Sequence, residues 1–205
     1  MSATEEQGAC FDGRLAAKPH AVVVPWPGQG HINPLLHLSK ILASQGFSIT
    51  FVNLQYTHSR VMSSIHRQEL EETQRGKGLP PLAKLDIRFV CIPDGIPADT
   101  PTGDVPELCR GVIRSSSAFE HLLHELHPPP TCIISDTFVL HSQDAANKFG
   151  IPRVSFWTQS VATYAVYQIL ARGSILWPSG ACLCHHLSVS VRLCLSLCLL
   201  SLYRL

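Results

Sequence analysis

Residues 22–34 read Val-Val-Val-Pro-Trp-Pro-Gly-Gln-Gly-His-Ile-Asn-Pro, an apolar run that stops at a turn rich in proline and glycine. The run occupies residues 20–24 without polar alternation, which is typical of a strand buried on both faces of a parallel sheet. Asn33 and Pro34 then have the residue types of an N-cap and a first helical position. The stretch therefore predicts a strand, a close turn and a helix, with His31 presented at the start of the helix.

The segments that follow repeat this alternation of apolar strand and amphipathic helix. Leucines recur on one helical face of residues 35–42, Gly46 is placed to end the helix, and residues 48–53 read as a second strand. The same patterns predict strands at 86–92, 131–135 and 153–157, and helices at 58–73, 105–126, 139–149 and 160–171. Strands and helices that alternate with short connections indicate a doubly wound, mostly parallel α/β sheet of Rossmann-like type.

Three segments fall outside this alternation. Residues 1–18 are small and polar and predict a disordered tail, so the predicted domain begins at residue 19 and ends near 178. Residues 93–106 are rich in proline and glycine and predict a long irregular loop, of a kind that is usually functional or mobile. Residues 179–205 are a low-complexity tail of leucine, cysteine and serine, which we interpret as sequence outside the native fold. A membrane anchor is the alternative, but the apolar run is short for a span.

The composition bounds the classes of function. Hydrophobic residues make up 45% of the 205 residues, charged residues make up 15%, and the formal net charge is +1, as in a globular protein. This charge predicts no nucleic-acid partner and no polybasic membrane anchor. The N-terminal residues contain acidic side chains and no apolar core of a signal peptide, so we expect a cytoplasmic location and no membrane span. The sequence predicts no particular oligomeric state.

Polar residues gather where the predicted strands end. In an open parallel sheet, ligands bind beyond the carboxyl ends of the strands. His31 follows the first strand, Asp136 closes the fourth and Thr158 follows the fifth. If the first and fourth strands are neighbours, Asp136 can accept a hydrogen bond from one ring nitrogen of His31 and leave the other nitrogen as a base. We therefore predict a catalytic pair that takes a proton from a hydroxyl group, so that its oxygen attacks an electrophile.

Other kinds of site fit less well. The turn imitates a dinucleotide fingerprint, but Asn33 occupies the third glycine position and the second strand ends in Asn53 rather than an acidic residue. The sequence contains neither a phosphate-binding loop with Gly-Lys-Ser/Thr nor the Gly-x-Ser-x-Gly elbow of a hydrolase. His121, His124 and His127 allow a metal site on one helix, but a solvated helix face is the preferred interpretation, and we predict no metal.

Several motifs, taken together and in order, resemble those of plant UDP-glycosyltransferases. They are residues 20–34, residues 46–53 with the following His58 and Arg60, and residues 132–136, 150–154 and 156–158. The resemblance covers about residues 19–178. It implies a two-domain GT-B enzyme, in which an N-terminal Rossmann-like domain binds a small-molecule hydroxyl acceptor such as a flavonoid or terpenoid. A C-terminal domain of the family binds the UDP-sugar.

The resemblance also implies roles for single residues. His31 would be the general base, Asp136 its partner, and Thr158 would lie near the donor sugar, in an inverting displacement that needs no metal or cofactor. The residues expected to contact substrate are Gly28, Gln29, Gly30, Asn33, Trp157 and Thr158. Residues 179–205 do not resemble the donor domain, so we expect a truncated enzyme that is inactive alone. The alternative is a non-catalytic module that binds small molecules.

Overall fold

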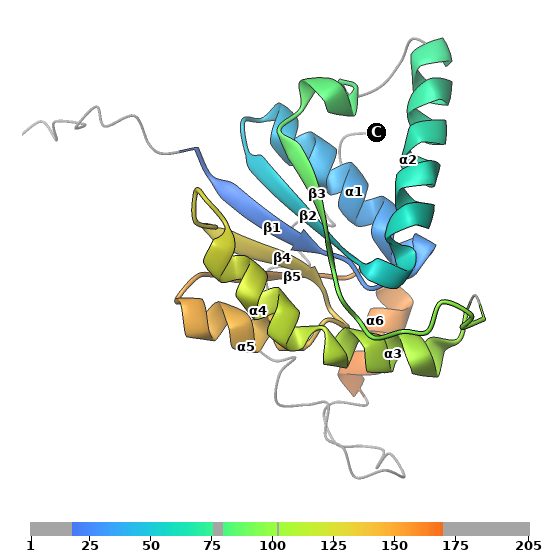
Figure 1. Cartoon of the computed structure of the whole chain (residues 1–205), viewed down its shortest axis with the longest axis vertical. Helices are drawn as coiled ribbons and strands as arrows, with labels where there is room; N and C mark the ends of the chain where they lie inside the picture. Colours follow the sequence, from blue (N-terminus) through green and yellow to red (C-terminus); the bar gives the residue numbers. More distant parts are fainter. Residues whose placement is uncertain (1–17, 76–79, 102, 170–205) are drawn as a thin grey trace, which may run out of the picture.

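The computed structural model describes residues 18–75, 80–101 and 103–169. The predictions for the low-complexity tail at 179–205 and for residues 1–17 lie outside the described residues. Figure 1 shows one twisted sheet with helices on both of its faces. None of the described helices is both long enough and apolar enough to cross a bilayer.

The sheet has five strands in the order β3-β2-β1-β4-β5, and every pair of neighbours is parallel. The strands are β1 (His20–Val24), β2 (Ser48–Leu54), β3 (Ile87–Ile92), β4 (Cys132–Asp136) and β5 (Arg153–Phe156). All five were predicted to within about a residue of their ends. The chain moves outward from β1 through β2 to β3 and then returns to β4 on the other side of β1. The order therefore reverses between β1 and β4, which is where a doubly wound sheet opens a ligand crevice.

Helices cover both faces of the sheet, and each face has its own apolar core. The helices are α1 (Gln29–Ser44), α2 (Gln55–Arg75), α3 (Val105–Arg114), α4 (Ser116–Glu125), α5 (His141–Phe149) and α6 (Val161–Ile169), with a 3₁₀ turn η1 (Leu82–Lys84). In Figure 1, α1 and α2 lie over one face and α4 and α5 over the other. Side chains of β1 alternate between the two cores, since Val23 packs with Leu35 of α1 and Val22 packs with Phe119 of α4.

Helix α1 begins earlier than the sequence predicted, so the expected N-cap at Asn33 is wrong. Gly28 is the N-cap, with φ −126° and ψ 146°. Its carbonyl accepts from the backbone N–H groups of His31 and Ile32, each at 2.9 Å. Pro34 lies inside the helix, where it leaves the carbonyl four residues earlier, that of Gly30, without its usual helical donor. The predicted end is confirmed, because Gly46 has φ +96° just after the helix.

The predicted helix 105–126 is two helices, which divide at Ser115. This serine is fully buried, and its hydroxyl donates to the carbonyl of Val112 at 2.8 Å. A serine hydroxyl that bonds to the preceding turn weakens the helical hydrogen-bond pattern and favours a bend. In Figure 1 the two helices have different axes: α4 lies on the sheet, and α3 extends beside its carboxyl edge.

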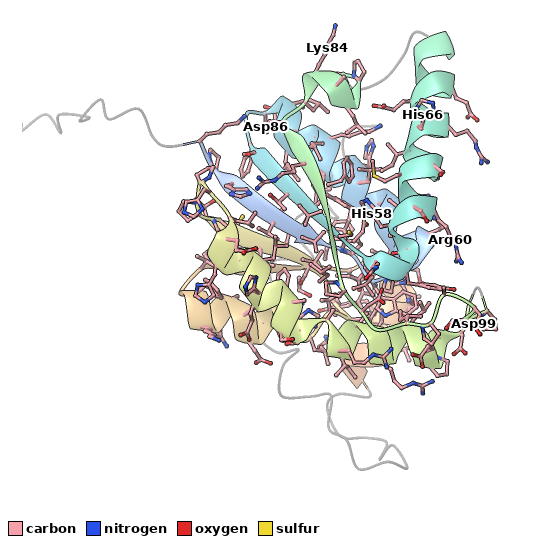
Figure 2. The ribbon with its side chains drawn as sticks, in the orientation of Figure 1. His58, Arg60, His66, Lys84, Asp86 and Asp99 are labelled. Carbon is pink, nitrogen blue, oxygen red and sulfur yellow. The ribbon has the colours of Figure 1, made fainter. Side chains whose placement is uncertain are left out.

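The irregular loop before α3 is anchored to the domain by a buried carboxylate. Asp94 is 3% exposed and accepts from the backbone N–H groups of Tyr56, at 2.9 Å, and Ile96, at 2.8 Å. The Tyr56 hydroxyl donates to the carbonyl of Thr100 at 2.8 Å, further along the loop. Figure 2 shows Asp99 at the outer end of this loop. The loop therefore places α3 at a fixed position near the carboxyl ends of the strands.

Candidate active site

The turn after β1 brings His31 against an aromatic ring. A Cβ atom at Gly28 would lie 2.8 Å from Cζ3 and 3.0 Å from Cε3 of Trp26, so a side chain at this position would displace the indole. The rings of Trp26 and His31 have centroids 5.1 Å apart. Gln29 and Gly30 are exposed in the first turn of α1. Gly28 therefore has a geometric reason to lack a side chain, whereas nothing lies within 4 Å of a Cβ atom at Gly30.

Strand β4 delivers Asp136 to His31. The strands β1 and β4 are neighbours, with Val24 beside Ser135, so the next residue of β4 reaches the start of α1. Asp136 is fully buried, and its Oδ2 atom lies 2.7 Å from Nδ1 of His31. Its Oδ1 atom accepts from the backbone N–H of Phe138 at 2.9 Å. Each carboxylate oxygen therefore has a partner, as a charge withdrawn from water requires.

Thr158, just beyond β5, completes the polar centre. Its Oγ1 atom lies 2.8 Å from Nδ1 of His31 and 3.5 Å from Oδ2 of Asp136. An ionised carboxylate only accepts hydrogen bonds, so Nδ1 of the neutral ring carries the proton and donates it toward Asp136. The Nε2 atom is then unprotonated and free to act as a base. The structure thus brings Thr158 to the His31–Asp136 pair, and its expected contact with the donor sugar stays a prediction.

A cavity of about 560 Å³ opens beside His31. This volume is in the range of sites that hold small organic molecules. Most of its lining is apolar or aromatic. The lining residues are Trp26, His31, Val105, Cys109, Val112, Ile113, Ser116, Phe138, Leu140, His141 and Gln159.

Two predicted substrate contacts have other surroundings in the structure. Trp157 is 8% exposed, and its ring packs against Phe138, Tyr164 and Tyr167, with centroids 5.9, 5.4 and 5.4 Å away. Trp157 thus contacts Phe138, which lines the cavity, but it is not itself a lining residue. Asn33 is exposed on α1, also outside the lining. The direct substrate roles of both residues stay predictions.

The sequence analysis missed the second wall of the cavity. Phe138, Leu140 and His141 lie two to five residues after Asp136, and applying the carboxyl-edge rule to the whole segment would have found them. Helix α3 supplies more of this wall, and here the available signal was weak. Its apolar residues Val105 and Ile113 are 52% and 71% exposed, because they face the cavity rather than the core.

His141 is the second histidine of the cavity, and its environment differs from that of His31. The pKa of His141 is lowered to about 4, mainly by burial. The charge of Arg153 acts in the same direction, and the charges of Asp144 and Glu120 oppose the shift. Its ring packs edge-on against Phe119, with centroids 5.5 Å apart. The imidazole is therefore neutral at pH 7, and its Nε2 atom has no hydrogen-bond partner in the part of the chain that the structure describes.

Arg153 of β5 forms hydrogen bonds with the end of β4. Its Nε atom donates to the hydroxyls of Ser135 and Ser142, at 2.7 and 2.8 Å, and one terminal nitrogen donates to the carbonyl of Asp136 at 3.3 Å. Burial lowers the pKa of Arg153 to about 10, against the opposing charge of Asp136, so the guanidinium is still charged at neutral pH. These contacts fix the backbone that carries Asp136.

The histidines of α4 and of the residues just after it do not converge on a common point. His121 pairs with Glu125 at 3.4 Å, His124 packs on the ring of Phe149, and His127 contacts the carbonyl of Glu125. Within the described ranges, no group of three or more His, Cys, Asp or Glu side chains is arranged to hold a metal ion.

Comparisons with known proteins agree on one family. Residues 19–76 match the family model described as the N-terminal domain of glycosyltransferases. UDP-glycosyltransferase 85A5 of Arabidopsis thaliana is 39% identical over 158 residues, and (R)-mandelonitrile beta-glucosyltransferase of Prunus dulcis is 44% identical over 151 residues. The alignments cover 73% and 70% of this chain but only 31% and 29% of these relatives. The chain thus spans about a third of the length of the curated relatives that it matches.

Solved structures show the same fold. The crystal structure of UDP-glucose: anthocyanidin 3-O-glucosyltransferase in complex with UDP is similar, with a TM-score of 0.58 and 22% sequence identity. The similarity covers 76% of this chain and 33% of that one. At this level of identity the likeness concerns the fold alone, and it agrees with the Rossmann-like parallel sheet described above.

Proposed function

Because the chain belongs to the plant UDP-glycosyltransferase family, we propose that it forms the acceptor-binding part of a sugar-transferring enzyme. The reaction moves a sugar from a UDP-sugar to a hydroxyl group of a small, largely apolar molecule of the flavonoid or terpenoid kind. The observation that carries the proposal is the His31–Asp136 hydrogen bond of 2.7 Å at the wall of a cavity of about 560 Å³. A base beside an apolar cavity suits the activation of a hydroxyl on an apolar molecule.

The proposed chemical step begins with the acceptor hydroxyl at His31. Nε2 takes the proton of this hydroxyl while its oxygen forms a bond to the anomeric carbon of the sugar. The bond from that carbon to UDP breaks on the opposite face, so the configuration inverts and UDP leaves with the electron pair. The new positive charge on His31 is stabilised by the buried carboxylate of Asp136, 2.7 Å from Nδ1. The step includes no metal or organic cofactor, since it needs only a base and a good leaving group.

The binding of the UDP-sugar involves more of the protein than this chain contains in its match to the relatives. The relatives are about three times as long as the part that this chain matches, and we propose that most contacts to the UDP-sugar come from the region outside the match. Thr158 is the described residue that we place nearest the sugar. It lies just beyond the end of β5 and contacts His31 of the His31–Asp136 pair. We place the protein in the cytoplasm, as its composition suggests.

A second candidate is a small-molecule binding module without turnover. The observation in its favour is that His31, Asp136 and all the residues that line the cavity lie within residues 26–159. Acceptor binding would therefore be expected of this chain by itself, whereas transfer needs contacts to the donor. We propose that the 205-residue chain alone binds acceptors and is inactive or nearly so.

One preparation separates these candidates. The 205-residue protein is titrated with 2-naphthol by calorimetry and then incubated with UDP-glucose and 2-naphthol, with the glucoside measured by chromatography. We expect saturable binding without detectable product. Product formation that is lost in His31→Ala would show a complete enzyme and contradict the inactivity of the chain. Failure to bind 2-naphthol or any other apolar phenol would contradict both candidates.

A further inference from the structure

One residue of the cavity lining, His141, has a buried ring nitrogen without a hydrogen-bond partner among the described residues. Among the described residues, the buried side-chain atoms without a hydrogen-bond partner include atoms of Asn53 and His58 and the Nε2 atom of His141. His141 is the one of these that lines the cavity. A buried donor or acceptor left without a partner costs about 1–3 kcal/mol of stability. Such a group at the wall of a cavity is one that a bound molecule can satisfy.

The protonation state of His141 determines what it can recognise. Its ring is neutral at physiological pH, because burial and the charge of Arg153 hold its pKa near 4. A neutral imidazole offers one N–H donor and one acceptor nitrogen, so it suits a hydroxyl group, which also donates and accepts. The same low pKa makes His141 a poor base at neutral pH.

The surroundings of His141 suggest how an acceptor lies. Phe138 is placed between the two histidines in the chain, and its ring centroid is 5.9 Å from that of His31. Phe138, Val112 and Leu140 give the cavity apolar surface for the body of a molecule. Polar side chains then meet the molecule at defined points, and His31 and His141 are two of them.

We infer that His141 is a specificity-determining residue, which forms a hydrogen bond with a second polar group of the acceptor while the reacting hydroxyl lies at His31. The substrate class is thus a rigid apolar molecule with at least two hydroxyl groups, in preference to a simple monohydroxyl compound. This inference rests on the proposed function, because it requires the acceptor to occupy the cavity beside His31.

The test compares matched probes and matched variants by calorimetry. The probes are 2-naphthol and its 2,6- and 2,7-dihydroxy analogues, which share one apolar body and differ in the second hydroxyl. The variants are His141→Phe, which keeps a ring of similar size without nitrogens, and His141→Gln, which keeps a donor and an acceptor. His121→Phe is the control, since the side chain of His121 is 74% exposed and lies outside the cavity. Circular dichroism and urea unfolding establish that each variant is folded.

We expect the wild-type protein and His121→Phe to prefer at least one diol over 2-naphthol. In His141→Phe this preference should fall by about tenfold, the discrimination lost with one good hydrogen bond to a buried group. The affinity for 2-naphthol should be unchanged or higher, and His141→Gln should restore part of the preference. A preference that survives in His141→Phe, or a wild-type protein that binds all three probes equally, would overturn the inference and leave acceptor binding intact. Failure of the wild-type protein to bind any probe would overturn the proposed function itself.

Discussion

At the scale of single residues, the candidate site is organised by what each side chain needs once it is buried. Asp136 has no solvent exposure, and it is tolerable as an anion because His31, Phe138 and Thr158 supply donors around its oxygens. His141 solves the same problem differently, by staying neutral. Two histidines of one cavity therefore differ in chemistry because one has a carboxylate partner and the other has not.

The neutral state of His141 makes a prediction about stability and pH. Its pKa is about 4 in the folded protein and 6.5 in the unfolded chain, so the unfolded state binds more protons between these values. Its contribution to stability is therefore complete above about pH 6.5 and is lost as the pH falls toward 4. The shift corresponds to on the order of 3 kcal/mol.

Urea unfolding of wild-type protein and His141→Phe at pH 7.5 and 4.5 measures this contribution. We expect the wild-type protein to lose at least about 1 kcal/mol more than the variant between the two pH values. Asp86 and Glu107 also have lowered pKa values, through hydrogen bonds with Lys18 and Arg114, and they destabilise both proteins equally at low pH. Figure 2 shows Asp86 near the end of the sheet where β3 begins. Equal losses in the two proteins would show that His141 is not held neutral by burial.

At the scale of elements, the errors of the sequence analysis have a common cause. Asn33 and Pro34 have the residue types of a helix start, but α1 is begun by the backbone carbonyl of Gly28, which has no side-chain signature. Similarly, the apolar pattern of residues 105–126 runs on through the bend, and only the hydroxyl of the buried Ser115 marks it. Helix boundaries set by backbone hydrogen bonds are invisible to patterns of side chains.

The packing of α3 gives a prediction at this scale. Gly111 is buried on α3, and a Cβ atom there would overlap Cδ1 and Cγ1 of Ile96 in the loop that follows β3. Gly111→Ala should therefore destabilise the fold by about 1–3 kcal/mol, although alanine is the better helix former. Gly30→Ala is the matched control, because nothing lies within 4 Å of a Cβ atom at this exposed helical position. It should stabilise the fold by about 0.5–1 kcal/mol.

Both variants are compared with wild-type protein by urea unfolding at one pH. The account of α3 would be wrong if Gly111→Ala were as stable as the wild-type protein, because Ile96 would then have room to move aside. A loss of acceptor affinity in Gly111→Ala would further indicate that this contact sets the position of the cavity wall.

At the scale of the whole molecule, the fold class was the most predictable feature. The five strands and their parallel direction follow from alternating buried strands and amphipathic helices, since parallel strands require crossover connections. The strand order was not predicted, so the contact between His31 and Asp136 was expected only if β1 and β4 were neighbours, and the sheet meets this condition. The wall formed by α3 could not be predicted, because it depends on long-range contacts of the preceding loop, such as the one between Asp94 and Tyr56.

The central claim is that His31 presents an unprotonated Nε2 to an acceptor bound in the cavity. Nitrogen NMR of the histidine rings, recorded at pH 8 during a titration with 2-naphthol, tests it most directly. We predict that free His31 carries its proton on Nδ1, and that 2-naphthol shifts the Nε2 signal saturably while the exposed His121 stays unchanged. The account would be contradicted if the proton of His31 lay on Nε2, or if 2-naphthol bound the protein without affecting the His31 signals.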